Sequence, residues 1–218
     1  MKDGCSCATL PRMPSPTPLP GESPFRALGV IYTGARDYYE AGAVPGGYAT
    51  VCRQIVDPAL RTFAEQPFVY AGLYDALPIA AISQAAAMAA GLTHKEMAVR
   101  NARWLAERDI SRVFRFLLQS SKPSQVALRL PKVSLRFFQF GTTEASLVDD
   151  CTVEARQTQV PTSLALWMIW SVEGFAPVAL EMAGAKNVRV LMAGAPQPDG
   201  HVNGLETSTL RWRIRWSI

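Results

Sequence analysis

The sequence LETSTLRWRIRWSI, residues 205–218, shows the clearest periodicity in the chain and decides its fold class. From Thr209 onward, polar and apolar residues alternate with a period of two, which is the pattern of a β-strand with one buried face. Trp212 and Trp216 fall on the apolar side. Two indoles on a buried face predict that the sheet packs against a large apolar element, and the segment 164–183 is the candidate.

Other patterns in the second half of the sequence predict the elements that surround this strand. Alternation at 126–130 and again at 133–137 predicts a hairpin, or one bent strand, around Pro131-Lys132. Residues 151–160 and 188–192 predict further strands, and the polar residues 196–204 predict a turn before the last strand. Between them, LALWMIW (164–170) opens an apolar helix that runs to Ala183, with a kink at Pro177 and a C-cap at Gly184.

The first half predicts helices with recognisable starts. They begin at Asp57-Pro58, at Pro78, at the capping box Thr93–Glu96 and at Asp109, and the second of them ends at Gly91. Helices first, then strands with one helix among them, predict an α+β fold in which an antiparallel sheet follows the N-terminal helices. At 218 residues, one domain is favoured over two.

The N-terminal segment differs in composition from the rest. Residues 11–24 hold six of the sixteen prolines, with Ser, Thr and Gly between them. Proline lacks an amide donor and has a fixed φ, so such a stretch cannot join a helix or the interior of a sheet. We therefore predict an extended, disordered leader over 1–24 and a folded domain over 25–218.

Composition excludes several classes of protein. Hydrophobic residues make up 49% and charged residues 18%, which supplies a full core, and a net charge of +4 is too mild to indicate nucleic-acid binding. No run reaches 18 apolar residues, so no membrane span is expected, and no secretory signal is recognisable. Four cysteines without a CxxC pair indicate reduced thiols, and hence a cytoplasmic protein.

The sequence contains no recognisable motif for catalysis. There is no nucleophile elbow, no phosphate-binding loop and no dinucleotide fingerprint. The two histidines, His94 and His201, offer little general-base capacity, and Cys52 is expected to be an inert buried thiol. The expectation is a protein that is not an enzyme, with no catalytic residues, no cofactor and no metal.

The order of elements and a few short motifs resemble a known group of domains. The motifs are Leu130-Pro131-Lys132, Glu173-Gly174-Phe175, the run from Ala179 to Ala185, Val188-Arg189-Val190 and Arg211-Trp212. Over about residues 25–218 the chain resembles an uncharacterised myxobacterial family of similar length. That family is distantly similar to 4-vinyl-reductase domains and to heme-nitric-oxide-binding domains.

The resemblance does not extend to heme ligation. Heme-nitric-oxide-binding domains hold iron through a histidine on the helix before the sheet, and a Tyr-x-Ser-x-Arg element grips the propionates. Here the corresponding helix, 109–121, contains no histidine, and the Tyr-x-Ser-x-Arg run is missing. His94 lies one helix earlier, behind its cap, where a solvated side chain is expected. Vinyl-reductase-type domains instead bind apolar small molecules or serve as scaffolds.

Two functions from different classes remain open. The first is a non-catalytic interaction or scaffold module of a cytoplasmic assembly, with a protein partner or a homo-oligomer. Its candidate docking face is the arginine stripe Arg211, Arg213 and Arg215, whose alternative explanation is a solvated sheet face neutralised by cross-strand glutamates. The second is a sensor domain that holds an apolar small molecule between helices and sheet. Its candidate lining is aromatic and is equally explained as ordinary core: Trp104, Phe114, Phe138, Trp167 and Trp170.

Overall fold

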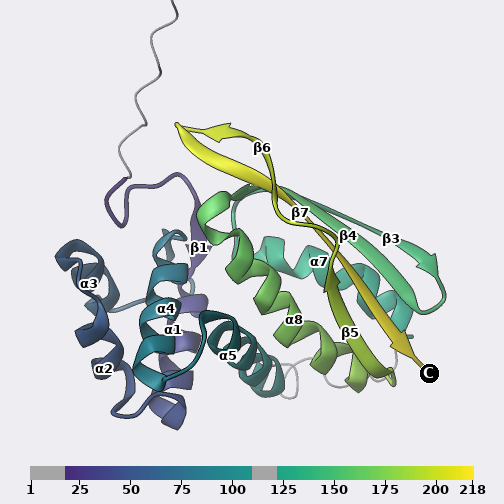
Figure 1. The fold of residues 1–218 in the computed structure, drawn as a ribbon, viewed down its shortest axis with the longest axis horizontal. Helices are drawn as coiled ribbons and strands as arrows, with labels where there is room; N and C mark the ends of the chain where they lie inside the picture. The colour runs from purple at the N-terminus through teal and green to yellow at the C-terminus, as the bar shows by residue number, and fades with distance from the viewer. Residues whose placement is uncertain (1–17, 110–121) are drawn as a thin grey trace, which may run out of the picture.

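The N-terminal half of the molecule is a layer of helices, and the C-terminal half is a twisted antiparallel sheet with two helices on one face (Figure 1). The structure is a computed structural model that describes residues 18–109 and 122–218. The predicted helix from Asp109 to Ser121, including Phe114, lies outside the described residues apart from its first position. The α+β class and the single domain are confirmed.

The helical layer contains five helices and a two-stranded ribbon among the described residues. In chain order they are β1 (Arg26–Leu28), α1 (Gly29–Tyr38), a π-helical turn (Tyr39–Ala43), α2 (Gly47–Gln54), α3 (Pro58–Glu65), β2 (Leu73–Asp75), α4 (Pro78–Ala90) and α5 (His94–Asp109). The ribbon pairs β1 with β2 in antiparallel fashion.

The helix boundaries predicted from capping residues are confirmed. The Asp57 carboxylate accepts hydrogen bonds from the amides of Ala59 and Leu60 at 2.8 and 3.1 Å, which caps α3. Gly91 ends α4 with a φ of +65°, a conformation that glycine adopts without strain. The capping box is complete, because the Thr93 amide donates to Glu96 and the Glu96 amide donates back to Thr93 Oγ1.

The end of the proline-rich leader is fastened to the helical layer through Asp75. This buried carboxylate accepts hydrogen bonds from the amides of Gly21 and Ser23 at 2.9 and 3.1 Å, from the Ser23 hydroxyl, and from the Leu77 amide at 2.9 Å. Ser23 is fully buried. The contacts of the domain therefore begin a few residues before Phe25.

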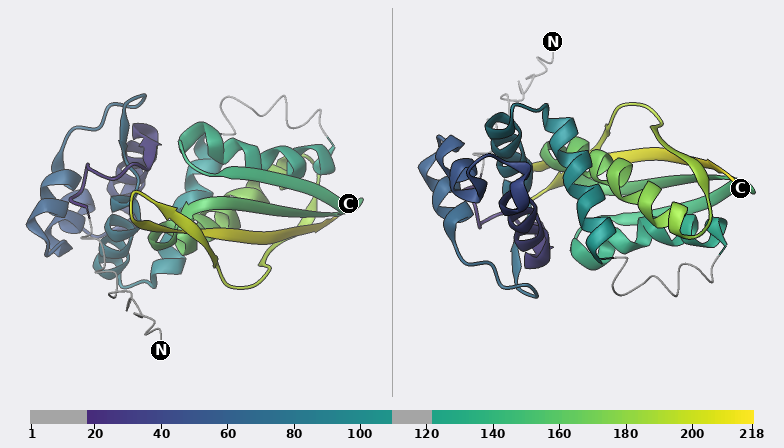
Figure 2. Two further views of the ribbon diagram at one scale, coloured as in Figure 1. Left: turned by 90° about the horizontal axis from the view of Figure 1, so that it is seen from above. Right: turned by 90° about the horizontal axis from the view of Figure 1, so that it is seen from below.

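From residue 122 onward, the described chain contains two α-helices and five strands. They are α7 (Pro123–Phe137), β3 (Thr142–Asp149), β4 (Thr152–Pro161), α8 (Ala165–Met182), β5 (Lys186–Met192), β6 (Gln197–Val202) and β7 (Leu205–Ser217), with a 3-10 turn (Thr162–Leu164) before α8. The strand order is β3-β4-β7-β5, all antiparallel, and β6 pairs with the first part of β7. In Figure 2, α7 and α8 cover one face of this sheet and leave the other face open.

The final strand has the predicted alternation. Leu210, Trp212, Ile214 and Trp216 are buried, whereas Arg211 and Arg215 are exposed. α8 packs between this buried face and α5, so the predicted partner of the two indoles is also confirmed. The helix continues through Pro177 from Ala165 to Met182.

One segment, Thr162–Met182, has the length and hydropathy of a membrane span, but 56% of its apolar window is buried inside the fold. Because α5, β5 and β7 all pack against it, this segment is the core helix of the domain.

The predicted strands at 126–130 and 133–137 are wrong, because these residues form the single helix α7. Val126, Leu130, Val133 and Phe137 also follow the spacing of one helical face, and Pro123 suits the first turn of a helix. A short apolar run fits either period, and here packing against the sheet decides for the helix. Pro131 is accommodated inside α7, and its carbonyl accepts a hydrogen bond from the Ser134 hydroxyl at 2.7 Å.

The predicted turn at 196–204 is also wrong in part, because it contains β6. Only Asn203 and Gly204 form the turn, with φ of +50° and +81°. Val202 and Leu205 on either side of them are paired, so the hairpin has a two-residue turn. Asn-Gly between two strands is a strong hairpin signal, which the sequence analysis did not use. Strand β3 was not predicted either; it is exposed along most of its length and carries no clear apolar face.

Candidate functional site

A cavity of about 160 Å³ lies between the two layers of the fold. Its wall comes from helices α1, α5, α7 and α8 and from the inner face of strands β4 and β7. The lining residues include Val30, Ile31, Asn101, Ala102, Leu105, Leu130, Val133, Ser134, Phe137, Phe138, Gln157, Trp167, Met168, Ser171, Val172, Phe175, Ala176, Trp212 and Ile214. No charged side chain is among the described residues of this wall.

The wall is apolar apart from a few polar groups, and two of these are already satisfied. The Ser134 hydroxyl donates to the Pro131 carbonyl at 2.7 Å, and the Ser171 hydroxyl donates to the Trp167 carbonyl at 2.9 Å. Both bonds stay within one helix. These two serines therefore offer the cavity little unsatisfied polarity.

Four other residues of the wall each have a buried polar atom without a hydrogen-bond partner in the described part of the chain. The atoms are Asn101 Oδ1, Gln157 Nε2, Trp167 Nε1 and Trp212 Nε1. They come from four different elements: α5, β4, α8 and β7. A buried polar atom left unpaired costs about 1–3 kcal/mol, so such atoms are rare in folded proteins. Four such atoms therefore belong to residues of this one wall.

A second, smaller hollow of about 20 Å³ lies behind the main cavity. The two share Ile31, Asn101 and Trp167, and Tyr39 and Ser83 also line the smaller one. Because the three shared residues line both hollows, they form the partition between them.

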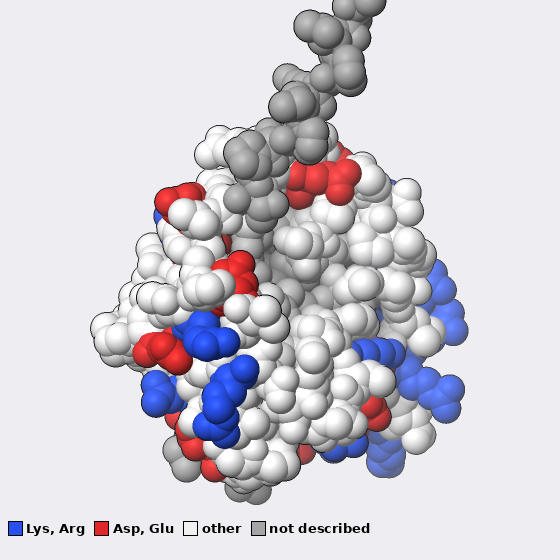
Figure 3. Space-filling view, turned by 60° about the vertical axis from the view of Figure 1, so that its left-hand side comes forward, with Lys and Arg blue, Asp and Glu red and all other residues white. Residues whose placement is uncertain are grey.

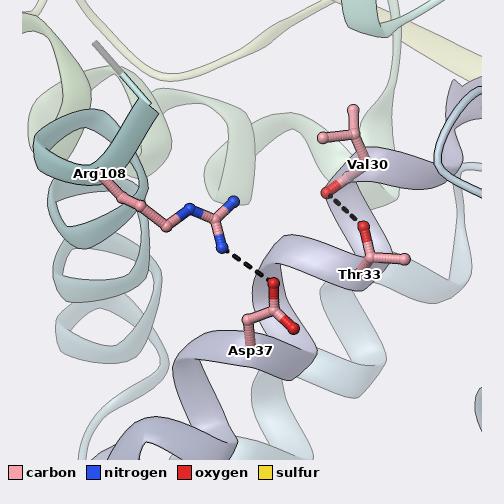
Figure 4. Close-up of polar contacts among 4 residues, drawn as sticks. All are labelled: Val30, Thr33, Asp37 and Arg108. Atoms are coloured by element: carbon pink, nitrogen blue, oxygen red, sulfur yellow. Dashed lines mark hydrogen bonds and ion pairs between the residues drawn. The ribbon is translucent and has the colours of Figure 1, made fainter. Parts of the chain in front are cut away.

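Close backbone approach and one ion pair hold the helices that form the wall. A Cβ at Gly174 of α8 would lie 2.2 Å from the Val99 carbonyl oxygen of α5, so only glycine permits this contact. Figure 4 shows that Arg108 of α5 reaches Asp37 of α1, with an N–O distance of 2.9 Å. α1, α5 and α8 each contribute lining residues, and these contacts therefore fix the width of the cavity.

Of the five aromatic residues predicted to line a ligand pocket, the structure places two in the wall of the cavity. Phe138 and Trp167 line the cavity. Trp104 packs instead on Tyr38 and under the Arg108 guanidinium, at 5.5 and 4.8 Å. Trp170 does not line the cavity and packs against His94, and Phe114 lies outside the described residues. The sequence analysis missed Asn101 and Gln157, whose only signal is a polar residue at an otherwise apolar position of a helix or strand.

His94 is half-buried rather than solvated as expected. Its ring packs edge-on against Trp170, with ring centres 5.1 Å apart, and Nε2 is buried with no partner among the described residues. This burial lowers the pKa of His94 from its usual value of 6.5. The Cys52 thiol is shifted in the opposite direction, since burial raises its pKa, and it stays protonated at neutral pH.

The three arginines of the stripe share the outer face of β7, opposite to the cavity. Arg213 forms an ion pair with Glu154 directly across on β4. Its neighbours are opposed by like charges, because Arg211 faces Arg156 on β4 and Arg215 faces Arg189 on β5. Like charges directly opposite in a sheet are destabilising, so cross-strand glutamate neutralises only the middle of this stripe.

The charge pattern of this face differs from that of the helical end. In the view of Figure 3, which brings the helical end forward, acidic and basic side chains lie close to one another. On the outer sheet face, five arginines share the surface with Glu144 and Glu154: Arg156, Arg189, Arg211, Arg213 and Arg215. Within the described residues, neither Arg211 nor Arg215 forms an ion pair.

Comparison with known proteins supports the fold. No family model matches the chain, and no curated protein matches it. Among solved structures, an H-NOX protein of T. tengcongensis superposes with a TM-score of 0.58 at 14% identity, covering 87% of this chain and 95% of that one. An oxygen-binding H-NOX domain related to soluble guanylate cyclases gives a TM-score of 0.56 at 14% identity, covering 87% and 93%.

A third structure, the Fe(II) unliganded H-NOX protein of K. algicida, gives a TM-score of 0.58 at 11% identity, with 88% of this chain and 97% of that one covered. The chain therefore has the fold of H-NOX domains and is distantly similar to them. At this identity the likeness concerns the arrangement of helices and strands, and says nothing of shared ligands.

The described residues of the cavity do not fit a heme. Among its described residues, the wall contains no histidine, cysteine or tyrosine to bind iron, and no arginine or lysine to pair with propionates. Met168 is the one side chain there with a soft donor atom. No cluster of three or more His, Cys, Asp or Glu that could hold a metal occurs elsewhere in the described chain. The uncharged and largely apolar side chains of the described wall instead suit an uncharged organic molecule.

Proposed function

We propose that this protein is a non-enzymatic sensor domain that takes up a small apolar molecule between its helical layer and its sheet, as a cytoplasmic protein. The observation that carries the proposal is the cavity of about 160 Å³ with an uncharged, largely apolar described wall. Well-packed proteins contain few voids larger than a water molecule, and each void lowers stability. A binding function accounts for a hollow of this size, partly open to the surface, between the two layers of the fold.

The H-NOX fold supports this proposal over a scaffold. One of the similar structures is an oxygen-binding H-NOX domain in its oxygen complex, so a protein with this arrangement of elements binds a small ligand. For the present chain, the ligand would differ, since the cavity lacks the donors for heme. The closer relationship to myxobacterial and 4-vinyl-reductase domains remains a prediction of the sequence.

Binding of benzene to the full chain tests the proposal. A cavity of about 150 Å³ lined by apolar side chains is known to bind benzene or xenon, so this cavity is large enough. Benzene at about ten times its Kd should raise the free energy of unfolding by about 1.4 kcal/mol. We expect this shift in thermal or denaturant unfolding of the parent protein.

Two variants of α7 provide the matched comparison. Val133→Phe adds volume at the cavity wall and should abolish the benzene effect, whereas Leu135→Phe makes the same kind of change on the exposed side of the helix and should leave it intact. If neither benzene nor xenon changes the unfolding transition of the parent at any concentration, the cavity is not a binding site and the proposal fails.

A second candidate function, docking of an acidic protein partner, rests on a separate observation. Two arginines of the outer sheet face are held opposite other arginines without a described carboxylate partner. A sensor needs an output surface, so the two functions are compatible. The arginine stripe is the surface that we propose for this role.

A further inference from the structure

We infer, on the basis of the proposed function, that the ligand is an uncharged molecule between benzene and indole in size that carries one hydrogen-bonding group. Three features of the cavity carry the inference: its volume, the charge of its wall, and its unpaired polar atoms. Each limits the ligand in a different way.

The volume limits the size of the ligand. A cavity of about 160 Å³ is close to the cavities of about 150 Å³ that accept a single benzene ring. The adjoining hollow of about 20 Å³ adds room for a few more atoms if the partition of Ile31, Asn101 and Trp167 shifts. One aromatic ring, or a ring with a small fused or attached group, matches this space.

The wall limits the charge of the ligand. None of its described residues is Asp, Glu, Lys, Arg or His, so an ionised ligand would find no counter-charge. Transfer of an unpaired charge from water to such a site is far more costly than transfer of a neutral polar group. Carboxylates and ammonium compounds are therefore excluded in favour of neutral molecules.

The unpaired atoms define the polarity of the ligand. Gln157 Nε2 and the indole N–H groups of Trp167 and Trp212 are donors, and Asn101 Oδ1 is an acceptor. A purely apolar ligand would leave all four unpaired. A ligand with a hydroxyl, carbonyl or ring N–H can relieve at least one, and each relieved atom avoids part of the cost of burying it alone.

The two amides are the groups that can reach such a ligand. All four atoms are covered by neighbouring atoms of the protein. An indole has no terminal amide to turn, whereas the amides of Asn101 and Gln157 can rotate about their last side-chain bond. We therefore assign the recognition of the polar group to Asn101 and Gln157, which approach the cavity from α5 and β4.

Calorimetric titration with toluene and phenol tests the inference, because the two probes have nearly the same shape and differ in the hydroxyl. For each protein, the Kd for toluene is divided by the Kd for phenol, and this ratio is compared between the parent and the double variant Asn101→Leu/Gln157→Leu. The two probes differ in hydration, but this difference is the same for both proteins and cancels in the comparison. We expect the variant to lose phenol preference at least about ten-fold. Gln54→Leu, at an exposed position of α2, should leave the ratio unchanged.

The outcomes separate this inference from the proposed function. If neither probe binds the parent, the proposed function itself fails. If toluene binds but the ratio is the same in parent and variant, the cavity binds ligands and the assignment of a polar ligand is overturned. Binding of benzoate as tight as that of phenol would overturn the claim of neutrality. Should the double variant not fold, Asn101→Leu and Gln157→Leu as separate single variants provide the same comparison with smaller changes.

Discussion

Trp212 and Trp170 illustrate how burial separates two residues of the same type. Trp212 is 3% exposed on the inner face of β7, whereas Trp170 is only half-buried and packs on His94. Trp212→Ala should therefore lower the free energy of unfolding by about 3–5 kcal/mol. Trp170→Ala should cost about 1–2 kcal/mol, in the range of ordinary partly buried sites.

Denaturant unfolding of the two variants against the parent measures both values. Equal midpoints for Trp212→Ala and the parent would show that the inner face of β7 is assigned incorrectly. A loss at Trp170 as large as that at Trp212 would mean that the contact with His94 contributes more than its burial indicates.

The half-buried His94 ring makes the free energy of unfolding depend on pH. The burial of the ring determines the direction of this dependence. The pKa of His94 in the folded protein lies below that of the unfolded chain, near 6.5. Between these two values the unfolded state binds more protons, so stability decreases as the pH is lowered through this window and is fully present above it. His94→Gln should flatten this part of the stability profile.

The matched control is His201→Gln, at an exposed position of β6. Unfolding measured between about pH 5 and 8 should show the same profile for this control as for the parent. If instead His201→Gln flattens the profile and His94→Gln leaves it unchanged, the pH dependence does not come from the buried ring.

At the scale of elements, the contact between α5 and α8 depends on Gly174. Replacement of glycine by alanine inside a helix normally stabilises by about 0.4–1 kcal/mol, because it restricts the unfolded chain. Here the added Cβ would lie 2.2 Å from the Val99 carbonyl oxygen. Gly174→Ala should therefore destabilise the protein by about 1–3 kcal/mol, as overpacking does. Denaturant unfolding of this variant and the parent shows whether the free energy of unfolding falls or rises. A rise would show that the two helices can move apart freely.

The role of the arginine stripe can be tested by substitution of its two outer members. Arg211→Gln/Arg215→Gln removes one member of each opposed arginine pair and leaves Arg213 with Glu154. Stability should be unchanged or slightly raised, because repulsion is relieved. Binding of a polyglutamate peptide should be weaker than to the parent, whose own binding should fall as salt is raised.

The charge-matched control for the stripe is Arg53→Gln/Arg100→Gln, which lowers the net charge equally on helices α2 and α5. This control should bind the peptide as the parent does. If both double variants lose binding to the same extent, net charge and not the stripe attracts the peptide.

Elements with a single strong signal were predictable, and those whose residues fit two periods were not. Caps at Asp57, Gly91 and Thr93 located helix ends, and the alternation from Thr209 onward located β7. The segment 123–137 fits a strand pair and a helix equally, and only its packing on β3 and β4 selects the helix.

For the candidate site, the sequence pointed to aromatic residues because they are large. Phe138 and Trp167 do line the cavity. Asn101 and Gln157 could not be recognised, since a lone polar residue in an amphipathic pattern looks like a surface position until the neighbouring elements are placed. The cavity itself comes from the imperfect fit between two layers, which no local pattern encodes.

For the whole molecule, the attachment of the leader to Asp75 predicts where truncation begins to matter. Removal of residues 1–17 leaves every described contact of Asp75 in place and should change stability by less than about 0.5 kcal/mol. Removal of residues 1–23 deletes the Gly21 and Ser23 donors. Hydrogen bonds to a charged group contribute about 1.5–3 kcal/mol each, so this second truncation should cost at least about 2 kcal/mol.

Thermal unfolding of the two truncated chains measures the difference. Equal melting temperatures for both truncations and the parent would mean that water replaces the lost donors at Asp75. A large loss already on removal of residues 1–17 would show that the leader contributes to the domain beyond the Asp75 contacts.

The cavity between the layers also makes the folded protein slightly larger than its atoms require. When the chain unfolds, water fills the part of this space from which the folded protein excludes it, so the total volume of protein and water falls by an amount that scales with that internal void. Hydrostatic pressure therefore favours the unfolded state of the empty protein more than that of a fully packed domain of equal length. A molecule bound in the cavity removes the void, and the occupied protein becomes the less compressible and more pressure-resistant form.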